Sequence, residues 1–126
     1  RYIFKELNGS QWDSLDPDLK RWSNQGVLLL NTALTVQIGK IGSHHDLWKP
    51  IIKLILSEIN DDLDGIPVVL FGVKAEEWHL RLHNQKIFKI PHPASAAYNG
   101  GKWDCDNIFY KINVILQEQN RSPILW

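Results

Sequence analysis

Two unbroken runs of apolar residues constrain the fold of this chain more than any other feature of its sequence. They are VLLL and IPVVLF, within the segments VLLLN at residues 27–31 and IPVVLFG at residues 66–72 that we expect to form strands. A strand with one face in water alternates apolar and polar residues, whereas a strand covered on both faces, as in a parallel sheet, is apolar throughout. A third, shorter run, KIFKI at residues 86–90, is also typical of a strand. We therefore predict three strands in the interior of the protein.

Helical patterns separate these predicted strands. Residues 46–61 repeat apolar side chains at helical spacing, with Asp46 as the expected N-cap and Pro50 in the first turn. Further helices are predicted at residues 73–84 and 103–120, and shorter ones at residues 1–8 and 19–26. Because strands alternate with helices, the predicted class is α/β with a central parallel sheet.

The size and charge of the chain limit what it does. Its 126 residues are enough for one domain, so we expect residues 1–126 to form a single unit. The 14 Lys and Arg residues balance 14 Asp and Glu residues, so any contact with nucleic acid must be local. No apolar run reaches the ~18 residues of a membrane span. The sequence begins at Arg1 without a methionine, and we expect a further segment ahead of it.

The cysteine and histidine content gives no indication of a metal or a disulfide. Cys105 is the single cysteine and cannot form an internal disulfide, so we expect a reducing compartment, the cytoplasm or the nucleus, and no secretion. Its place on the inner side of the last helix favours a small buried side chain. His79 and His83 are four residues apart, but no third ligand lies near them, and a solvated helix face is the preferred interpretation.

Polar residues follow two of the predicted strands. Asn31 comes directly after residues 27–30, and His92 follows the third strand, between Pro91 and Pro93. Ligands of parallel sheets bind at the carboxyl ends of the strands, so these two side chains form a candidate site. Two simpler interpretations remain: Asn31 caps the next turn through its own backbone, and His92 is a loop residue. The two prolines favour a role for His92, because they fix the backbone on both sides of it.

Five stretches, spread over nearly the whole chain, resemble the uracil-DNA glycosylase family. They are WSNQGVLLLNTALTV (22–36), SHHDLW (43–48), VVLFG (68–72), PHPASAA (91–97) and RSPILW (121–126). The resemblance implies a three-layer α/β/α fold and an enzyme of base-excision repair. Such an enzyme hydrolyses the N-glycosidic bond of a uracil flipped out of DNA, without a metal or a cofactor. It also implies uracil-containing DNA as partner, a monomer, and a protein inhibitor or partner at the DNA-binding face.

The resemblance implies a role for each of the two candidate residues. Asn31 matches the asparagine that reads the Watson–Crick edge of the flipped base. Its amide offers a donor and an acceptor together, which pairs with uracil and mismatches cytosine. His92 matches the histidine beside uracil O2 and is the expected catalytic residue. A donor placed there stabilises the negative charge that develops on the base as the bond breaks.

The resemblance also implies a set of DNA-facing residues, in which this chain departs from the family. The set comprises Gly72, Lys74, Pro93, Ser95, Ala96 and Tyr98. The phosphate-contacting Gly-Ser pair of the family is Gly72-Val73 here, so Lys74 is expected to supply charge instead. The leucine that fills the gap left by the flipped base is replaced by Ala96, which is too small for that task. A leucine at position 96 would then improve action on duplex DNA, with Tyr98 as the alternative wedge.

One part of the family pattern is not found in these residues. The family's GQDPYH motif carries the aspartate that positions or activates the attacking water, and it lies upstream of the segment that this chain resembles. One strand of the family's four-stranded sheet lies there too, and a sheet without it leaves strand edges exposed. Two interpretations stay open: a C-terminal portion of a glycosylase, or a non-catalytic relative or fragment that binds DNA or a protein.

Overall fold

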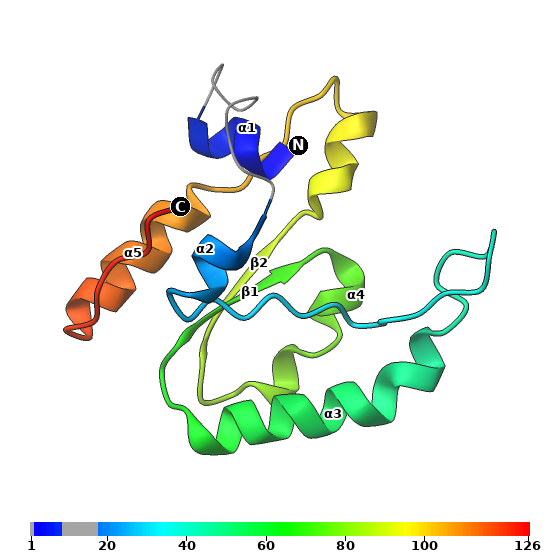
Figure 1. Cartoon of the computed structure of the whole chain (residues 1–126), viewed down its shortest axis with the longest axis horizontal. Coiled ribbons are helices and arrows are strands. Elements are labelled where there is room, and N and C mark those ends of the chain that lie inside the picture. The colour runs from blue at the N-terminus through cyan, green and yellow to red at the C-terminus, as the bar shows by residue number, and fades with distance from the viewer. Residues whose placement is uncertain (1, 9–17) are drawn as a thin grey trace.

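The structure is a computed structural model that describes residues 2–8 and 18–126 (Figure 1). The helices and strands follow one another along the chain as α1 (Tyr2–Asn8), α2 (Lys20–Ser23), α3 (His45–Asp62), β1 (Pro67–Phe71), α4 (Val73–Glu76), the 3-10 helix η2 (His79–Arg81), β2 (Lys86–Ile90), the 3-10 helix η3 (Pro93–Tyr98) and α5 (Ile108–Glu118). None of the helices in this described part is long and apolar enough to cross a membrane.

The sheet lies between two layers of helix, as the α/β class requires. Strands β1 and β2 pair in parallel, from Pro67 opposite Lys86 to Phe71 opposite Ile90. Alternate residues of β1 face opposite sides, so Val69 and Phe71 pack with the buried side of α5, while Val68 and Leu70 pack with α3. Figure 1 shows α3 and α5 on opposite sides of the two strands. The predicted parallel sheet and three-layer α/β/α arrangement are therefore confirmed.

The predicted strand at residues 27–31 is wrong for this structure. In the described part of the chain the sheet has two strands, β1 and β2, and residues 27–31 run outside it. Leu28 and Leu29 are 64% and 51% exposed. The apolar run correctly signals a segment suited to burial, but a strand also needs a hydrogen-bonded neighbour, and no described segment supplies one.

Several predicted helices begin or end elsewhere than the sequence pattern indicated. The segment predicted as one helix at residues 73–84 is two short pieces, α4 and η2. The last helix begins at Ile108, because Asp106 and Asn107 have φ angles of 52° and 53°, in the left-handed region that an α-helix excludes. Asp46 lies inside the first turn of α3, and His44 takes the N-cap position.

The carboxyl-terminal residues tie α5 to the segment around α2. The side chain of Asn113 donates to the Ile124 carbonyl at 2.9 Å and accepts from the Ile124 N–H at 2.8 Å. The side chain of Gln25 forms the same pair of bonds with the backbone of Leu125, at 3.2 and 2.7 Å. The ring of Trp126 packs edge to face on Trp22, with centroids 5.7 Å apart. The tail thus spans two helices far apart in the sequence.

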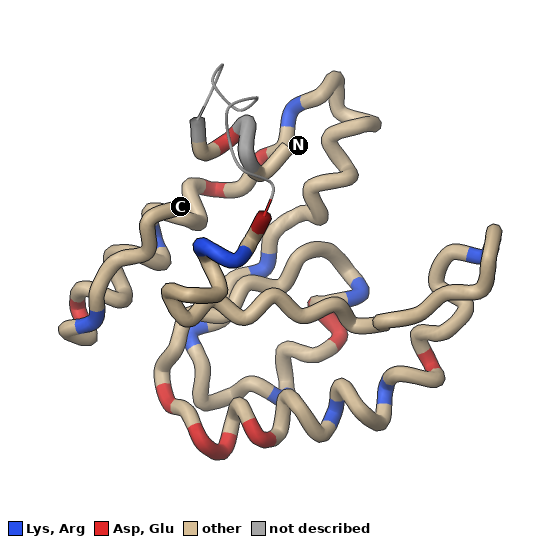
Figure 2. Tube along the Cα trace, viewed as in Figure 1, with Lys and Arg blue, Asp and Glu red and all other residues tan. Residues whose placement is uncertain are grey.

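Charged residues are spread along the chain, with one local excess of acid. Figure 2 shows acidic positions gathered at the end of α3 and in the turn after it. They are Glu58, Asp61, Asp62 and Asp64. This turn leads into the amino end of β1, so the acidic cluster lies at the opposite edge of the sheet from His92. A negatively charged ligand at the carboxyl edge would therefore be remote from this repulsion.

Candidate functional site

The carboxyl ends of β1 and β2 bring Gly72 and His92 into contact. Phe71 and Ile90 are opposite one another in the sheet, and the Gly72 N–H donates to the Ile90 carbonyl at 2.8 Å. Gly72 has a φ of +77°, which side chains rarely adopt. A β-carbon on Gly72 would stand 2.9 Å from the β-carbon of His92. Glycine is required here so that the two strand ends can lie against each other.

The imidazole of His92 is held by its own loop. His92 is the N-cap of η3, and its Nδ1 accepts a hydrogen bond from the Ala94 N–H at 3.1 Å. Since a backbone N–H is the donor, Nδ1 carries no proton in this arrangement, and the neutral ring bears its proton on Nε2. His92 is exposed. His92, the histidine between two prolines, therefore presents an N–H donor in a fixed tautomer at the carboxyl edge of the sheet.

The loop after His92 is only partly available to a ligand. Ala94 and Ala97 are exposed, Pro93 and Ser95 are half-buried, and Ala96 is fully buried. Ala96 belongs to the core cluster on the α5 side of the sheet, together with Ile90, Trp103, Cys105, Ile108, Ile112 and Leu116. Contrary to expectation, the Ala96 side chain offers no surface to DNA. Its small size is explained by packing, so a leucine there would crowd the core.

Tyr98 is the exposed side chain at the end of this loop. It closes η3, and 92% of it is exposed. Two residues, Ala96 and Tyr98, were candidates for the wedge that fills the space of a flipped base. Only the side chain of Tyr98 is accessible to DNA. It lies on the helical turn that begins at His92, so the histidine and the ring are presented by one short element.

Asn31 lies outside the contact between Gly72 and His92. It is exposed and follows the extended residues 27–30. Its neighbour Thr32 lines a pocket together with Lys74, which places the Asn31 segment beside α4, the helix that follows Gly72. Neither Asn31 nor His92 lines the pocket formed by Thr32 and Lys74. The candidate site that joins Asn31 and His92 therefore stays a prediction.

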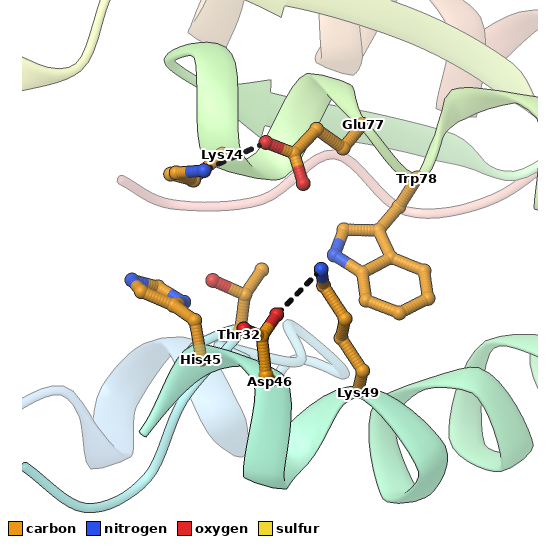
Figure 3. A pocket seen from close by; sticks show the side chains of 7 residues that line it. All are labelled: Thr32, His45, Asp46, Lys49, Lys74, Glu77 and Trp78. Carbon is orange, nitrogen blue, oxygen red and sulfur yellow. Dashed lines mark hydrogen bonds and ion pairs between the residues drawn. The ribbon is translucent and has the colours of Figure 1, made fainter. Parts of the chain in front are cut away.

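This pocket is lined by charged side chains from α3 and α4 (Figure 3). Its lining residues are Thr32, His45, Asp46, Lys49, Lys74, Glu77 and Trp78, and we call it the charged pocket. Lys49 bonds Asp46 at 2.7 Å, and Lys74 bonds Glu77 at 2.9 Å. Lys74, expected to meet a DNA phosphate, is thus already paired. Its side chain is 62% exposed, so a phosphate that displaced Glu77 would still reach it.

The four charges of the pocket act on one another across the two helices. The bond from Lys49 lowers the pKa of the Asp46 carboxyl, and the charge of Lys74 lowers it further. The bond from Lys74 lowers the pKa of Glu77, and Lys49 contributes to that lowering. Sequence reasoning missed this group, although the three-residue spacing of each opposite-charge pair would have indicated it.

The remaining polar candidates are accounted for by structure. Cys105 is buried, as predicted, and burial raises the pKa of its thiol. His79 bonds the Glu76 carbonyl at 2.9 Å, whereas His83 lies 3.4 Å from the Asn60 amide, so the two imidazoles have separate partners. Within residues 2–8 and 18–126, no group of three His, Cys, Asp or Glu side chains is placed to hold a metal ion.

The chain is an α/β protein with a parallel sheet, a class in which ligands bind at the carboxyl edge of the strands, and it presents His92 at that edge. Residues 4–116 match the family model of the uracil DNA glycosylase superfamily. The chain is 37% identical over 111 residues to a uracil-DNA glycosylase of Aliivibrio fischeri and 36% identical over 111 residues to one of Yersinia pestis. The chain therefore belongs to the uracil DNA glycosylase superfamily.

The same relatives are longer than this chain. The matches cover 86% of the chain but 49% and 48% of the two bacterial enzymes, so the chain spans about half their length. A mimivirus uracil-DNA glycosylase has the same fold, with a TM-score of 0.80 and 21% identity over 99% of this chain and 52% of the viral one. A mimivirus UNG variant in complex with UGI matches with a TM-score of 0.76 and 20% identity, over 100% of this chain and 56% of the variant.

Proposed function

We propose that the protein carrying this chain is a uracil-DNA glycosylase of base-excision repair. Its substrate is DNA that contains uracil, and the reaction is hydrolysis of the bond between uracil N1 and the sugar C1′. Membership of the superfamily supports this activity, and so do bacterial relatives that bear the name. The observation that carries the proposal is the bond from Ala94 to His92 Nδ1, which leaves an Nε2–H donor exposed at the carboxyl edge.

In this reaction His92 stabilises the leaving group. As the C1′–N1 bond breaks, its electron pair moves onto the uracil ring, and negative charge develops on O2. An N–H already aimed at O2 lowers the energy of that state without reorganisation. Water supplies the oxygen that bonds C1′. The family resemblance places the aspartate that positions or activates this water in a motif outside these 126 residues.

Asn31 is proposed to select uracil. Its side-chain amide presents one N–H and one carbonyl oxygen, the pattern complementary to uracil O4 and N3–H. Cytosine carries an amino group in place of O4 and an acceptor in place of N3–H, so both partners would be mismatched. The exposed position of Asn31 beside α4 is compatible with a base approaching from solvent.

The exposed face of η3 and the start of α4 form the proposed contact surface for DNA and for protein ligands. The proposed DNA-facing residues are Pro93, Ser95 and Tyr98 of η3, together with Gly72 and Lys74 at the start of α4. A mimivirus relative was solved in complex with UGI, which supports a protein ligand as a second kind of partner. The buried thiol of Cys105 is compatible with the proposed location in the cytoplasm or the nucleus.

The test is a single-turnover measurement of uracil release from an oligonucleotide by the intact protein that carries this chain. His92→Ala should lower the rate about 10²–10³-fold, the usual effect of removing one preorganised donor. Binding of the oligonucleotide should change little, because the donor acts on charge that appears only in the transition state. His83→Ala, which removes an exposed histidine at another edge, is the matched control and should keep the rate.

Two outcomes contradict the proposal. If the wild-type protein releases no uracil, the glycosylase function fails, and equal binding of uracil- and thymine-containing strands would then favour a binding module. If His92→Ala weakens binding and turnover equally, the histidine is structural and the assigned role is wrong.

A further inference from the structure

We propose that Trp103 is the positioning residue for His92, acting through the carbonyl of Pro91. The indole N–H of Trp103 donates to the Pro91 carbonyl at 2.8 Å. This inference rests on the proposed function of His92 as the donor to the leaving base. Trp103 is not expected to touch the DNA, because its side chain is 7% exposed and lies in the core cluster beside α5.

Three consecutive carbonyls around His92 are each held by a different donor. The Ile90 carbonyl accepts from the Gly72 N–H at 2.8 Å, and the His92 carbonyl accepts from the Ser95 N–H at 2.9 Å. The Pro91 carbonyl between them accepts from Trp103. Pro91 and Pro93 have no N–H of their own, so the backbone of these two residues can be held by hydrogen bonds only through their carbonyls. Of the three donors, Trp103 is the one that bonds through its side chain, whereas Gly72 and Ser95 bond through their backbone N–H groups.

The Trp103 ring is itself fixed by aromatic neighbours on two elements. It stacks on Phe71, with centroids 6.1 Å apart and planes 27° apart, and it meets Phe109 of α5 edge to face at 6.5 Å. Phe71 is the residue before Gly72, so one indole contacts the end of β1 and bonds the residue that follows β2. A ring so placed keeps the Pro91 carbonyl, and with it the peptide plane that leads into His92, in one orientation.

The orientation of that peptide decides where the Nε2–H donor of His92 points. A donor helps only if it meets O2 at hydrogen-bond distance, and a displacement of about 1 Å can cost on the order of 10²-fold in rate. Trp103→Phe keeps an aromatic ring for the contacts with Phe71 and Phe109 and removes the N–H. The smaller ring also gives up packing volume, so the comparison with and without His92, together with a second Trp→Phe variant, is needed to separate the hydrogen bond from that loss.

The first experiment is a double-mutant cycle on the single-turnover rate of uracil release by the intact protein. Trp103→Phe should lower the rate about tenfold. This effect lies between that of losing one hydrogen bond and the roughly 10²-fold effect of displacing the donor by about 1 Å. In a His92→Ala background the same change should cost less than about twofold, because the group it positions is gone. Affinity for an oligonucleotide with an uncleavable uracil nucleotide should stay the same.

Trp48→Phe is the matched control for this cycle. The Trp48 indole also donates one hydrogen bond, to the Thr35 hydroxyl at 2.8 Å, but it packs on the α3 side of the sheet. Its replacement should keep the rate to within about twofold in both backgrounds, the size of a small surface effect. Equal losses from Trp103→Phe with and without His92 would overturn the proposal, since Trp103 would then act on stability alone.

A second measurement tests whether Trp103 positions His92 and does not depend on catalytic activity. Hydrogen exchange of the Ala94 amide, which bonds His92 Nδ1, should accelerate in Trp103→Phe and stay unchanged in Trp48→Phe. Unchanged exchange in Trp103→Phe would overturn the proposal. If the wild-type protein releases no uracil, the proposed function fails, and the exchange measurement alone decides whether Trp103 positions His92.

Discussion

Gly72 and His92 lie against each other at the carboxyl edge of the sheet, although α4, η2 and β2 come between them in the sequence. The parallel register that sets Phe71 opposite Ile90 brings the two residues together, and the missing side chain of glycine allows the approach. The catalytic candidate is thus held by a residue that has no side chain of its own.

Gly72→Ala should therefore displace His92 and destabilise the fold. The positive φ alone makes this substitution strained, by about 1–3 kcal/mol, and the 2.9 Å approach to the His92 β-carbon adds a clash. Gly39→Ala is the control, because Gly39 has a φ of +73° and nothing within 4 Å of the added methyl group. Chemical denaturation of both variants measures the difference. If Gly72→Ala and Gly39→Ala were equally destabilising, the backbone at His92 would be able to move away from the added methyl group without a measurable loss of stability.

Ala96→Leu should lower the free energy of unfolding by about 1–3 kcal/mol, the usual cost of overpacking a well-filled core. Ala96 is fully buried, whereas its neighbour Ala97 is exposed. Ala97→Leu should therefore leave the unfolding midpoint nearly unchanged. A stable Ala96→Leu variant that acts better on duplex DNA would restore the wedge interpretation that the burial of Ala96 argues against.

Tyr98→Ala should reduce uracil release from duplex DNA more than from single strands. The exposed ring is the available group to fill the space left by a flipped base, and unstacking a base costs a few kcal/mol. Tyr110, which is 72% exposed on α5, provides the matched control. The ratio of duplex to single-strand rates is the measurement, and a ratio unaffected by Tyr98→Ala would remove this residue from the DNA contact.

Cys105 should react slowly with thiol reagents in the native protein. Burial raises the pKa of its thiol, so at a given pH the folded protein holds less of the reactive thiolate than the unfolded chain. Labelling at mildly alkaline pH should be slow without denaturant and fast in its presence. Fast labelling of the native protein would show that the core beside α5 opens readily.

Gln25→Ala should destabilise the protein by about 0.5–1.5 kcal/mol, because it removes the two bonds between the Gln25 amide and the Leu125 backbone at a site where water can replace the lost partner. Gln117→Ala, at an exposed position on α5, is the control and should be nearly neutral. Thermal unfolding of the two variants gives the comparison. A neutral Gln25→Ala would indicate that Asn113 and Trp126 hold the tail by themselves.

The parts of this fold that could be predicted are those fixed by local pattern. Residues 86–90 and the helix around Pro50 were found because apolar periodicity and helix-start signals are local properties. His92 was found because two prolines mark it in the sequence. Residues 27–31 were misassigned because an apolar run reports a tendency to be buried and says nothing about the presence of a pairing strand.

The relationships that escaped the sequence join residues that no local pattern connects. The indole of Trp103 meets a carbonyl twelve positions earlier, and the burial of Ala96 depends on where α5 lies. The contact of Gly72 with His92 depends on strand register, which is set by the whole sheet. These three relationships can be identified only once the arrangement of the strands and helices is known.

The attachment of the last residues to Gln25 has a consequence for how the protein is made. Gln25 and Leu125 are 100 positions apart, and the bonds between them cannot form until residue 125 has left the ribosome. The segment from Gln25 to Asn31 therefore lacks this anchor while the residues between Gln25 and Leu125 are being made. Leu28 and Leu29 lie in this exposed segment, so a nascent chain that has not yet reached Leu125 should present them to chaperones without the bonds that fix Gln25.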